Sequence, residues 1–473
     1  MSRKLLRTQV VGCADFHRAQ RTSRRQVLQA GCASALGLGL DALLGARAAA
    51  GSSVATGPAG FGKAKACIFL FMWGGPSQLE TFDPKPDAPA EIRGTFQPIA
   101  TAVPGTFISE HFQRVAKLTD RLAIVRSLSH NDPAHLSSGH VTLTGHLAPV
   151  VKSDADPPSE RDTPHLGSVV ARMRPASSLV PPFVTLPWLA MHPAAPGGRA
   201  PGQNGGWLGS RYDPMLIAGD PSKADWRVDA LALADDITLD RLNNRQSLLA
   251  TIDEQRRIAQ RAADAGVDGF KQKALSMLSS AAAREAFDLA AEPDAVRERY
   301  GRNIHGQSVL LARRLVEHGV SLVSVNWHND GRNFWDTHGN NFNRLKNDLI
   351  PPADQALAAL LTDLAERGML DETIVAWVGE FGRKPQIANN VAGRDHWPRC
   401  YSGLLAGGGI RGGAIYGASD AQAAYPAENA CSPQDYAATI YHALGIDPAV
   451  KLTDRMGRPL AVCEGRPLVP LFS

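Results

Sequence analysis

The sequence has few cysteines and no cysteine pair at metal-binding spacing. Only six cysteines occur in 473 residues, and none of them form a CxxC motif, so a cysteine-ligated zinc site is not expected. Four lie in the body of the chain, at Cys67, Cys400, Cys431 and Cys463. One or two disulfides are chemically allowed if the protein is exported, but the sequence does not show which cysteines would pair.

Strong net charge and long apolar runs are also lacking. The formal net charge is +4, and part of it comes from basic residues near the amino terminus, namely Arg3, Lys4, Arg7, Arg18, Arg21, Arg24 and Arg25. The rest of the chain is close to neutral and has no basic patch, so we expect no nucleic-acid partner. No apolar run reaches the ~20 residues of a membrane helix, so we expect no stable membrane span.

The first 50 residues have the form of an export signal. Residues 22–28, TSRRQVL, contain a twin-arginine pair, and a weakly apolar stretch with small residues at its end follows. We predict a signal peptide over residues 1–50 and a mature chain over 51–473, exported folded to the periplasm by the twin-arginine machinery. The alternative is that this segment is a basic amphipathic helix of the mature protein.

Short apolar runs alternate with helical patterns along the chain. The runs that predict strands are Lys65–Trp73, Leu122–Leu128, Phe183–Leu186, Val320–Val325, Thr373–Val378 and Ser402–Ala406. The helical patterns are Ile108–Thr119, Asp240–Ala263, Gly269–Leu289, Gly306–His318, Pro351–Arg367 and Pro433–Leu444. This alternation predicts an α/β fold with a mostly parallel sheet covered by helices on both faces. A loop-rich and then helical region at about 150–300 is predicted to be an insertion.

Carboxylates and imidazoles gather in three loop segments. Asp336 and His338 lie in FWDTHGNNF, Glu380 lies in VGEFGRK, and Asp395 and His396 lie in GRDHWP. Glu380 follows a predicted strand, and open α/β sheets place their sites at strand ends. Oxygen and nitrogen donors gathered there are the ligands that zinc, iron or manganese needs. The alternative is that these are unrelated polar residues of surface loops.

A helix start is predicted close to His135. Asp132 reads as the N-cap and Pro133 as the first helical residue, which places His135 in an exposed first turn. Free N–H groups and the helix dipole at that position favour an anion and a neutral imidazole. His135, and His140 in the same helix, are therefore candidates for contact with an anionic substrate. Alternatively, the histidines here are merely polar residues around a helix start.

Two further groups could contact an anion. Arg383 and Lys384 follow Glu380 closely and could clamp an anionic ester, although they could also be solvated loop charges. Gly74 and Gly75, after the first predicted strand, could present backbone N–H groups. Without a GxGxxG motif or a P-loop lysine, they give little support for a nucleotide site.

Longer segments carry a resemblance to known families. Residues 356–383, ALAALLTDLAERGMLDETIVAWVGEFGR, resemble the sulfatase and alkaline phosphatase superfamily, where a helix, GLLDxT, a buried strand and Asp-His-Gly follow in this order. Residues 432–447 look like its closing helix. The phrases GGPSQLETFDPKPDAPAEIRGTFQPIAT and GRDHWP are similar to an exported bacterial family called domain of unknown function 1501, over nearly the whole mature chain. The resemblance implies an alkaline phosphatase-like three-layer sandwich.

The resemblance also implies roles for the candidate residues. Asp336, His338 and His396 fit one metal site of the superfamily, which Glu380 and Asp395 would orient or complete. The second metal site looks degraded, because glycines replace its first-strand Asp and its Asp-His-Gly appears here as Glu-Phe-Gly. Counting back ten residues from the glycine of Leu-Thr-Gly puts His135 at the nucleophile position.

These observations favour an exported metal-dependent hydrolase of sulfate or phosphate esters, with polysaccharide esters among its candidate substrates. We expect one divalent metal, zinc first, with iron, manganese and calcium as alternatives. His135 and Glu380 would do the catalytic work, and Arg383, Lys384 and His140 would bind the substrate. The rival is a non-catalytic exported protein that kept the fold and binds glycans or envelope partners. The missing first-strand Asp and missing hydroxyl or thiol nucleophile favour this rival.

Overall fold

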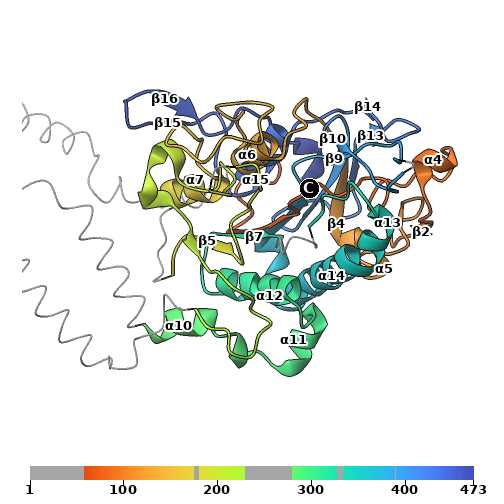
Figure 1. The fold of residues 1–473 in the computed structure, drawn as a ribbon. Coiled ribbons are helices and arrows are strands. Elements are labelled where there is room, and N and C mark those ends of the chain that lie inside the picture. The colour runs from red at the N-terminus through yellow and green to blue at the C-terminus, as the bar shows by residue number, and fades with distance from the viewer. Residues whose placement is uncertain (1–57, 175–179, 196, 229–279, 328–333, 389) are drawn as a thin grey trace, which may run out of the picture. The chain divides into compact units, whose positions relative to one another are not determined.

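An eight-stranded sheet forms the centre of the structure, with strand order β12-β4-β11-β8-β1-β7-β5-β6 (Figure 1). The computed structural model describes residues 58–174, 180–195, 197–228, 280–327, 334–388 and 390–473. The strands are β1 (Ala66–Phe71), β4 (Leu122–Leu128), β5 (Phe183–Leu186), β6 (Met215–Leu216), β7 (Leu322–Asn326), β8 (Thr373–Val378), β11 (Tyr401–Ala406) and β12 (Ile415–Tyr416). The predicted signal peptide and the helix predicted at 240–263 lie outside the described residues.

All six predicted strands are present, and the sheet is mostly parallel. Strand β11 runs antiparallel to both β4 and β8. The other pairings within the sheet are parallel. Every residue of β1, β8 and β11 is buried. This is why these strands read as continuous apolar runs and not as alternating ones.

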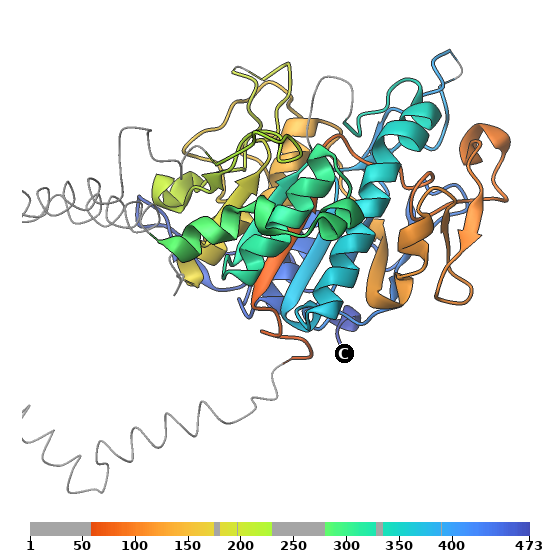
Figure 2. The same cartoon turned by 90° about the horizontal axis from the view of Figure 1, so that it is seen from below.

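Helices cover both faces of the sheet, which makes the three predicted layers (Figures 1 and 2). Helices α12 (Ile304–Glu317) and α14 (Ile350–Glu366) pack against each other on one face. Helices α6 (His135–Thr144), α7 (Leu166–Met173) and α15 (Pro433–Ala443) lie on the other. Helices α12, α14 and α15 confirm three of the helical patterns to within about two residues.

Shorter elements surround these layers. The other α-helices among the described residues are α4 (Ala90–Arg93), α5 (Gln113–Ala116), α10 (Ala281–Phe287), α11 (Asp294–Tyr300) and α13 (Asn341–Arg344). Four two-stranded ribbons are β2–β3 (Pro98–Ala100 and Phe107–Ser109), β9–β10 (Gly382–Arg383 and His396–Trp397), β13–β14 (Ala418–Ser419 and Pro426–Glu428) and β15–β16 (Lys451–Thr453 and Pro459–Ala461). The ribbon β9–β10 carries residues of the candidate site.

The predicted helix at Ile108–Thr119 is wrong. Residues Phe107–Ser109 form β3, which pairs with β2, and only the four residues Gln113–Ala116 are α-helical. The apolar side chains of Ile108, Phe112 and Val115 are all fully buried. Their spacing imitates one face of a helix, but each packs against the core from a different local structure.

The region at about 150–300, predicted to be an insertion, is partly built into the sheet. It contributes the parallel strands β5 and β6 and the covering helix α7. Of the helix predicted at Gly269–Leu289, the described part is α10. Among the described residues, no helix is long and apolar enough to cross a membrane. Cys67, Cys400, Cys431 and Cys463 are buried and unpaired.

Candidate metal centre

The candidate site lies where the parallel strands end. Strands β1, β4, β7 and β8 point the same way, since β4 and β8 both run against β11. The chain therefore delivers Gly74, His135, Asp336 and Glu380 to one edge, each from the segment after a different strand. Strand β11 begins at this edge, and the ribbon β9–β10 just before it brings His396. This is the edge at which open α/β sheets carry their sites.

The glycine turn after β1 allows the segments to approach closely. Gly74 has φ +110°, and a Cβ there would lie 2.4 Å from the backbone nitrogen of Asp336. No other residue fits without moving that segment. The N–H of Gly74 donates to the carboxylate of Glu380 at 2.9 Å. The N–H of Gly74 thus binds a carboxylate of the protein itself, whereas that of Gly75 donates to the carbonyl of Met72.

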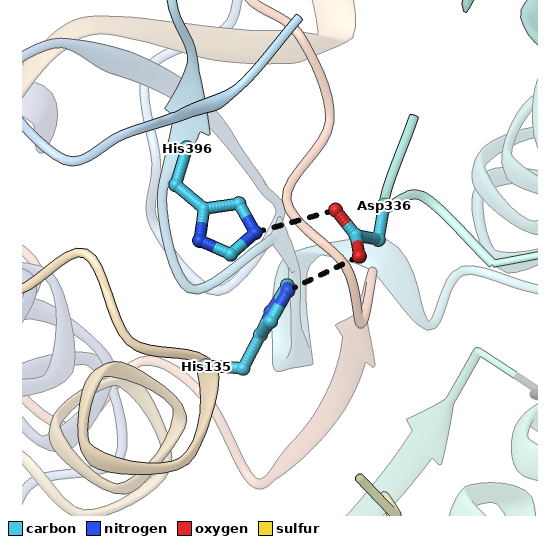
Figure 3. Close-up of side chains that lie close together, drawn as sticks. All are labelled: His135, Asp336 and His396. Carbon is cyan, nitrogen blue, oxygen red and sulfur yellow. Dashed lines mark hydrogen bonds and ion pairs between the residues drawn. The ribbon is translucent and has the colours of Figure 1, made fainter. Parts of the chain in front are cut away.

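One ring nitrogen of His135 points toward the Asp336 carboxylate (Figure 3). Its Nδ1 lies 2.6 Å from Oε1 of the fully buried Glu380. Nε2 lies 3.5 Å from Oδ2 of Asp336 and has no hydrogen-bond partner among the described residues, although it is buried. With Nδ1 held by Glu380, Nε2 is the nitrogen that a metal next to Asp336 would bind.

Two further imidazoles repeat this arrangement. Nδ1 of His396 is 2.7 Å from the carbonyl oxygen of Pro133, and its Nε2 is 3.3 Å from Oδ1 of Asp336. Nδ1 of His338 is 3.1 Å from Oδ1 of Asp395, and its Nε2 is 3.2 Å from Oδ1 of Asp336. Each Nδ1 thus has an oxygen acceptor, which leaves each Nε2 free to act as a ligand.

These donor atoms fit a divalent metal. One ligand atom each from His135, Asp336 and His396 lie within 4.8 Å of one another. The Nε2 atoms of His338 and His396 are only 2.9 Å apart. Two lone pairs at this distance need a shared proton or a cation between them. Zinc–nitrogen bonds of about 2.0–2.1 Å in a tetrahedral site place neighbouring donors roughly 3.3 Å apart.

The charges around the site favour an ionised Asp336. Burial opposes this, but the Arg383 guanidinium and the His135 and His396 rings hold the pKa of Asp336 well below its usual range. Burial also lowers the pKa of His396, which favours its neutral form. For His135, burial lowers the pKa, but the adjacent carboxylates of Asp336 and Glu380 outweigh it and raise the pKa to about 9. Without a metal the ring is therefore protonated at neutral pH, and a metal bound at Nε2 would take the place of a proton.

Arg383, predicted to contact the substrate, is enclosed by protein groups. Its side chain is 0% exposed and forms an ion pair with Oδ1 of Asp336 at 2.6 Å. In the ribbon β9–β10 it lies directly opposite His396. Lys384 is exposed, and its backbone N–H donates to the carbonyl of Asp395. Arg383 therefore reaches the site through Asp336, and Lys384 is at its margin.

His140 is not brought to the site. It is fully buried, and its Nε2 accepts a hydrogen bond from the N–H of Thr163 at 3.1 Å. Its Nδ1 lies near the hydroxyl of Thr144 and the carbonyl of His146. Burial lowers the pKa of His140 to about 4, so its ring is neutral. These contacts give His140 a place in packing α6.

The predicted start of the helix that carries His135 is wrong by two residues. Helix α6 begins at His135 itself, and Asp132 accepts from the N–H of Ala134 in the turn before it. The N–H of Leu136 in the first turn donates to Asp154 at 3.0 Å, so a carboxylate of the protein already occupies part of the predicted anion position. His135 is also 1% exposed, which corrects the expectation of an exposed residue.

His192 lies next to the candidate site but was not predicted from the sequence. Its ring centroid lies 5.4 Å from that of His135. Its loop is tied to β1 because the indole N–H of Trp73 donates to the carbonyl of Met191 at 3.0 Å. Burial lowers the pKa of His192. It is a single histidine in a proline-rich loop, without a neighbouring motif that would have singled it out.

Similarity to solved structures is weak. Phosphonate monoester hydrolase SpPMH from Silicibacter pomeroyi has a TM-score of 0.37 and 13% identity, covering 86% of this chain and 76% of that chain. Ps i-CgsB has a TM-score of 0.39 and 11% identity, with the same coverages. Alkaline phosphatase from the Antarctic bacterium TAB5 has a TM-score of 0.34 and 12% identity, covering 75% of this chain and 94% of that chain.

The comparison with curated proteins gave no match. A family model, in contrast, matches residues 64–471, which include all the strands of the central sheet and every residue of the candidate metal centre. The chain therefore belongs to the family described as "Protein of unknown function (DUF1501)".

Proposed function

We propose that the protein is a metal-dependent hydrolase of sulfate or phosphate esters, exported by the twin-arginine route. The observation that carries the hydrolase proposal is the convergence of three Nε2 atoms on the Asp336 carboxylate. The Nε2 of His135 is the clearest of the three, because it is buried and forms no hydrogen bond within the described part of the chain, which is costly unless a ligand satisfies it. The export proposal rests on the leader sequence alone.

His135, Asp336 and His396 are the proposed metal ligands. Their ligand atoms form one cluster, and their side chains come from three different segments of the fold (Figure 3). Glu380 and the Pro133 carbonyl hold the two imidazoles by Nδ1. Zinc is the first candidate for such nitrogen and oxygen donors, with iron and manganese as alternatives. A divalent metal bound there would polarise an ester oxygen and activate water.

His338 and Asp395 form the outer part of the site. The side chain of His338 is 48% exposed and that of Asp395 is 61% exposed, so both face the side from which a substrate arrives. The carboxylate of Asp395 fixes the proton on Nδ1 and directs Nε2 inward. An imidazole oriented in this way can move a proton to or from a reacting oxygen. His135 is thus proposed as a metal ligand and His338 as the acid–base residue, whereas the sequence led us to expect the reverse.

The proposal is tested by metal analysis together with an ester panel. The mature protein should contain about one equivalent of metal and hydrolyse aryl sulfates or aryl phosphates. His396→Ala and His135→Ala should each lose the metal and the activity. His338→Ala should keep most of the metal and lose activity. The matched control is His318→Gln, since His318 follows α12 at the opposite edge of the sheet.

The metal content and the activity of these variants distinguish the possible roles of His135. Metal kept and activity lost in His135→Ala would assign it to nucleophilic or acid–base work, and metal lost in His338→Ala would make His338 the third ligand. His135→Ala should also lower the free energy of unfolding by ~1–3 kcal/mol, because buried Glu380 loses a hydrogen-bond partner. A loaded wild-type protein that hydrolyses no ester would contradict the hydrolase proposal and favour the glycan- or envelope-binding alternative.

A further inference from the structure

The Arg383 guanidinium occupies a pocket made of oxygen atoms. Its Nε donates to the carbonyl of Gly75 at 3.0 Å, and Nη1 donates to the carbonyl of Arg394 at 3.2 Å. Its Nη2 donates to the carbonyl of Gly74 and pairs with Oδ1 of Asp336 at 2.6 Å. Three backbone carbonyls and one carboxylate thus surround a single positive charge with no exposure to solvent.

This oxygen pocket has the composition of a hard-cation site. Backbone carbonyls and a carboxylate are the ligands that calcium and magnesium take from proteins. The carbonyls of Gly74 and Gly75 can turn toward one point because both residues have positive φ, +110° and +76°. A Cβ at Gly75 would lie 2.6 Å from the ring of Phe381, so the turn is also closed in from that side.

We propose that the Arg383 guanidinium is a built-in cation that stands in for a second metal ion next to the proposed metal centre. It neutralises Asp336 from inside the protein and fixes Oδ1, while the imidazoles approach the same carboxylate from outside. The site therefore takes one metal ion, because a permanent side-chain charge fills the adjoining cation position. This inference rests on the proposed metal centre, but it does not require that the protein turn over any substrate.

The direct test removes the guanidinium and supplies a cation. Arg383→Ala leaves the four oxygens without a counter-charge, and adding Ca²⁺ should then raise its melting temperature and bind as one further equivalent by calorimetry. Wild type should show neither effect with Ca²⁺. Arg383→Met is the matched control, because methionine refills much of the volume without charge and should give no Ca²⁺ response.

A second variant checks that the response belongs to this position. Arg313 is equally buried, but its guanidinium lies in the α12–α14 layer and pairs with Glu292 and Asp363. Zinc binding at the histidines should therefore fall in Arg383→Met, which frees Asp336, and stay close to wild type in Arg313→Met. Equal losses in both variants would mean that Arg383 is merely structural.

Two results would overturn the inference. The first is a second equivalent of Ca²⁺, Mg²⁺ or Zn²⁺ in the wild-type protein, which can be measured even if no Arg383 variant folds. The second is a folded Arg383→Ala protein whose melting temperature and metal content do not respond to Ca²⁺. Loss of ester hydrolysis alone decides nothing here, because both readouts are metal binding and stability.

Discussion

At the scale of single residues, the contact between Glu380 and His135 is the one that most closely restricts the geometry of the candidate site. The carboxylate of Glu380 is fully buried and accepts from Gly74 as well as from His135. A carboxylate in this position fixes the ring and raises the basicity of its free nitrogen. Glu380 therefore acts through His135, as a positioning residue.

Glu380→Gln tests this role with almost no change of shape. Glutamine keeps an acceptor for His135 but loses the negative charge, so zinc affinity should fall by roughly 10–100-fold. Competition with a chromogenic chelator measures the change. Glu464→Gln is the control, because Glu464 is half exposed and forms its ion pair with His146, away from the candidate site. Unchanged zinc affinity in Glu380→Gln would show that His135 is not a ligand or is not oriented by Glu380.

At the scale of elements, a buried arginine joins α12 to α14. Arg313 on α12 is 0% exposed and pairs with Glu292 at 2.8 Å and with Asp363 of α14 at 2.9 Å. Burial opposes ionisation of both carboxylates, yet hydrogen bonds and charge from Arg314, Arg367 and Arg313 lower the pKa of Glu292 and of Asp363. The ion pairs therefore hold this helical layer together in a pH-dependent way.

Because these two carboxylates have lowered pKa values in the folded protein, their stabilisation is present above their ordinary pKa values. It is lost as the pH falls through the folded values. Arg313→Met should lower the free energy of unfolding at neutral pH by at most ~3–5 kcal/mol, since Glu292 and Asp363 each lose one buried partner but keep Arg314 and Arg367. It should also flatten the loss of stability toward acid. Urea unfolding from about pH 7 to about pH 3 measures both effects.

A control and a contrary result complete this test. Arg302→Met removes surface ion pairs with Asp294 and Glu298 and should cost less than about 1 kcal/mol. An Arg313→Met protein whose stability declines toward acid as steeply as that of wild type would show that Glu292 and Asp363 do not carry the acid-sensitive stability.

At the scale of the whole molecule, the export proposal makes a separate prediction. The twin-arginine machinery reads the arginine pair itself, so replacing Arg24 and Arg25 by lysine should leave precursor in the cytoplasm although the charge is unchanged. Cell fractionation and amino-terminal sequencing of the exported protein measure this. The mature chain should begin near residue 51. Unchanged export of the double-lysine variant would contradict the twin-arginine reading.

The fold was predictable where one signal dominates, as in strands buried on both faces. Runs such as Thr373–Val378 leave little choice of structure, since each side chain must leave water. The helix predicted at Ile108–Thr119 was wrong because the spaced apolar residues there reach the core from a strand and a short helix. Pairing with a neighbouring strand, as between β2 and β3, decides such cases, and the spacing of apolar residues within 107–119 does not show it.

The site was predictable in composition and less so in geometry. Asp336, His338, His396, Glu380 and Asp395 do come together, because strand ends meet at one edge. The burial of Arg383 and His140 could not be predicted from the sequence, because their partners are mostly backbone carbonyls, amides and residues of other segments. His192 lies in the irregular region, where periodicity gives no information.

The ligands of the proposed metal centre lie far apart in the sequence, and this links metal binding to folding. His396 and Asp336 are 60 residues apart, and His135 comes from another part of the sequence altogether. No short fragment of the chain can assemble these donors, so the site forms only after the central sheet has formed. A metal that binds this state and not the unfolded chain stabilises it by mass action. Metal uptake would then act as a checkpoint, which only completely folded molecules pass.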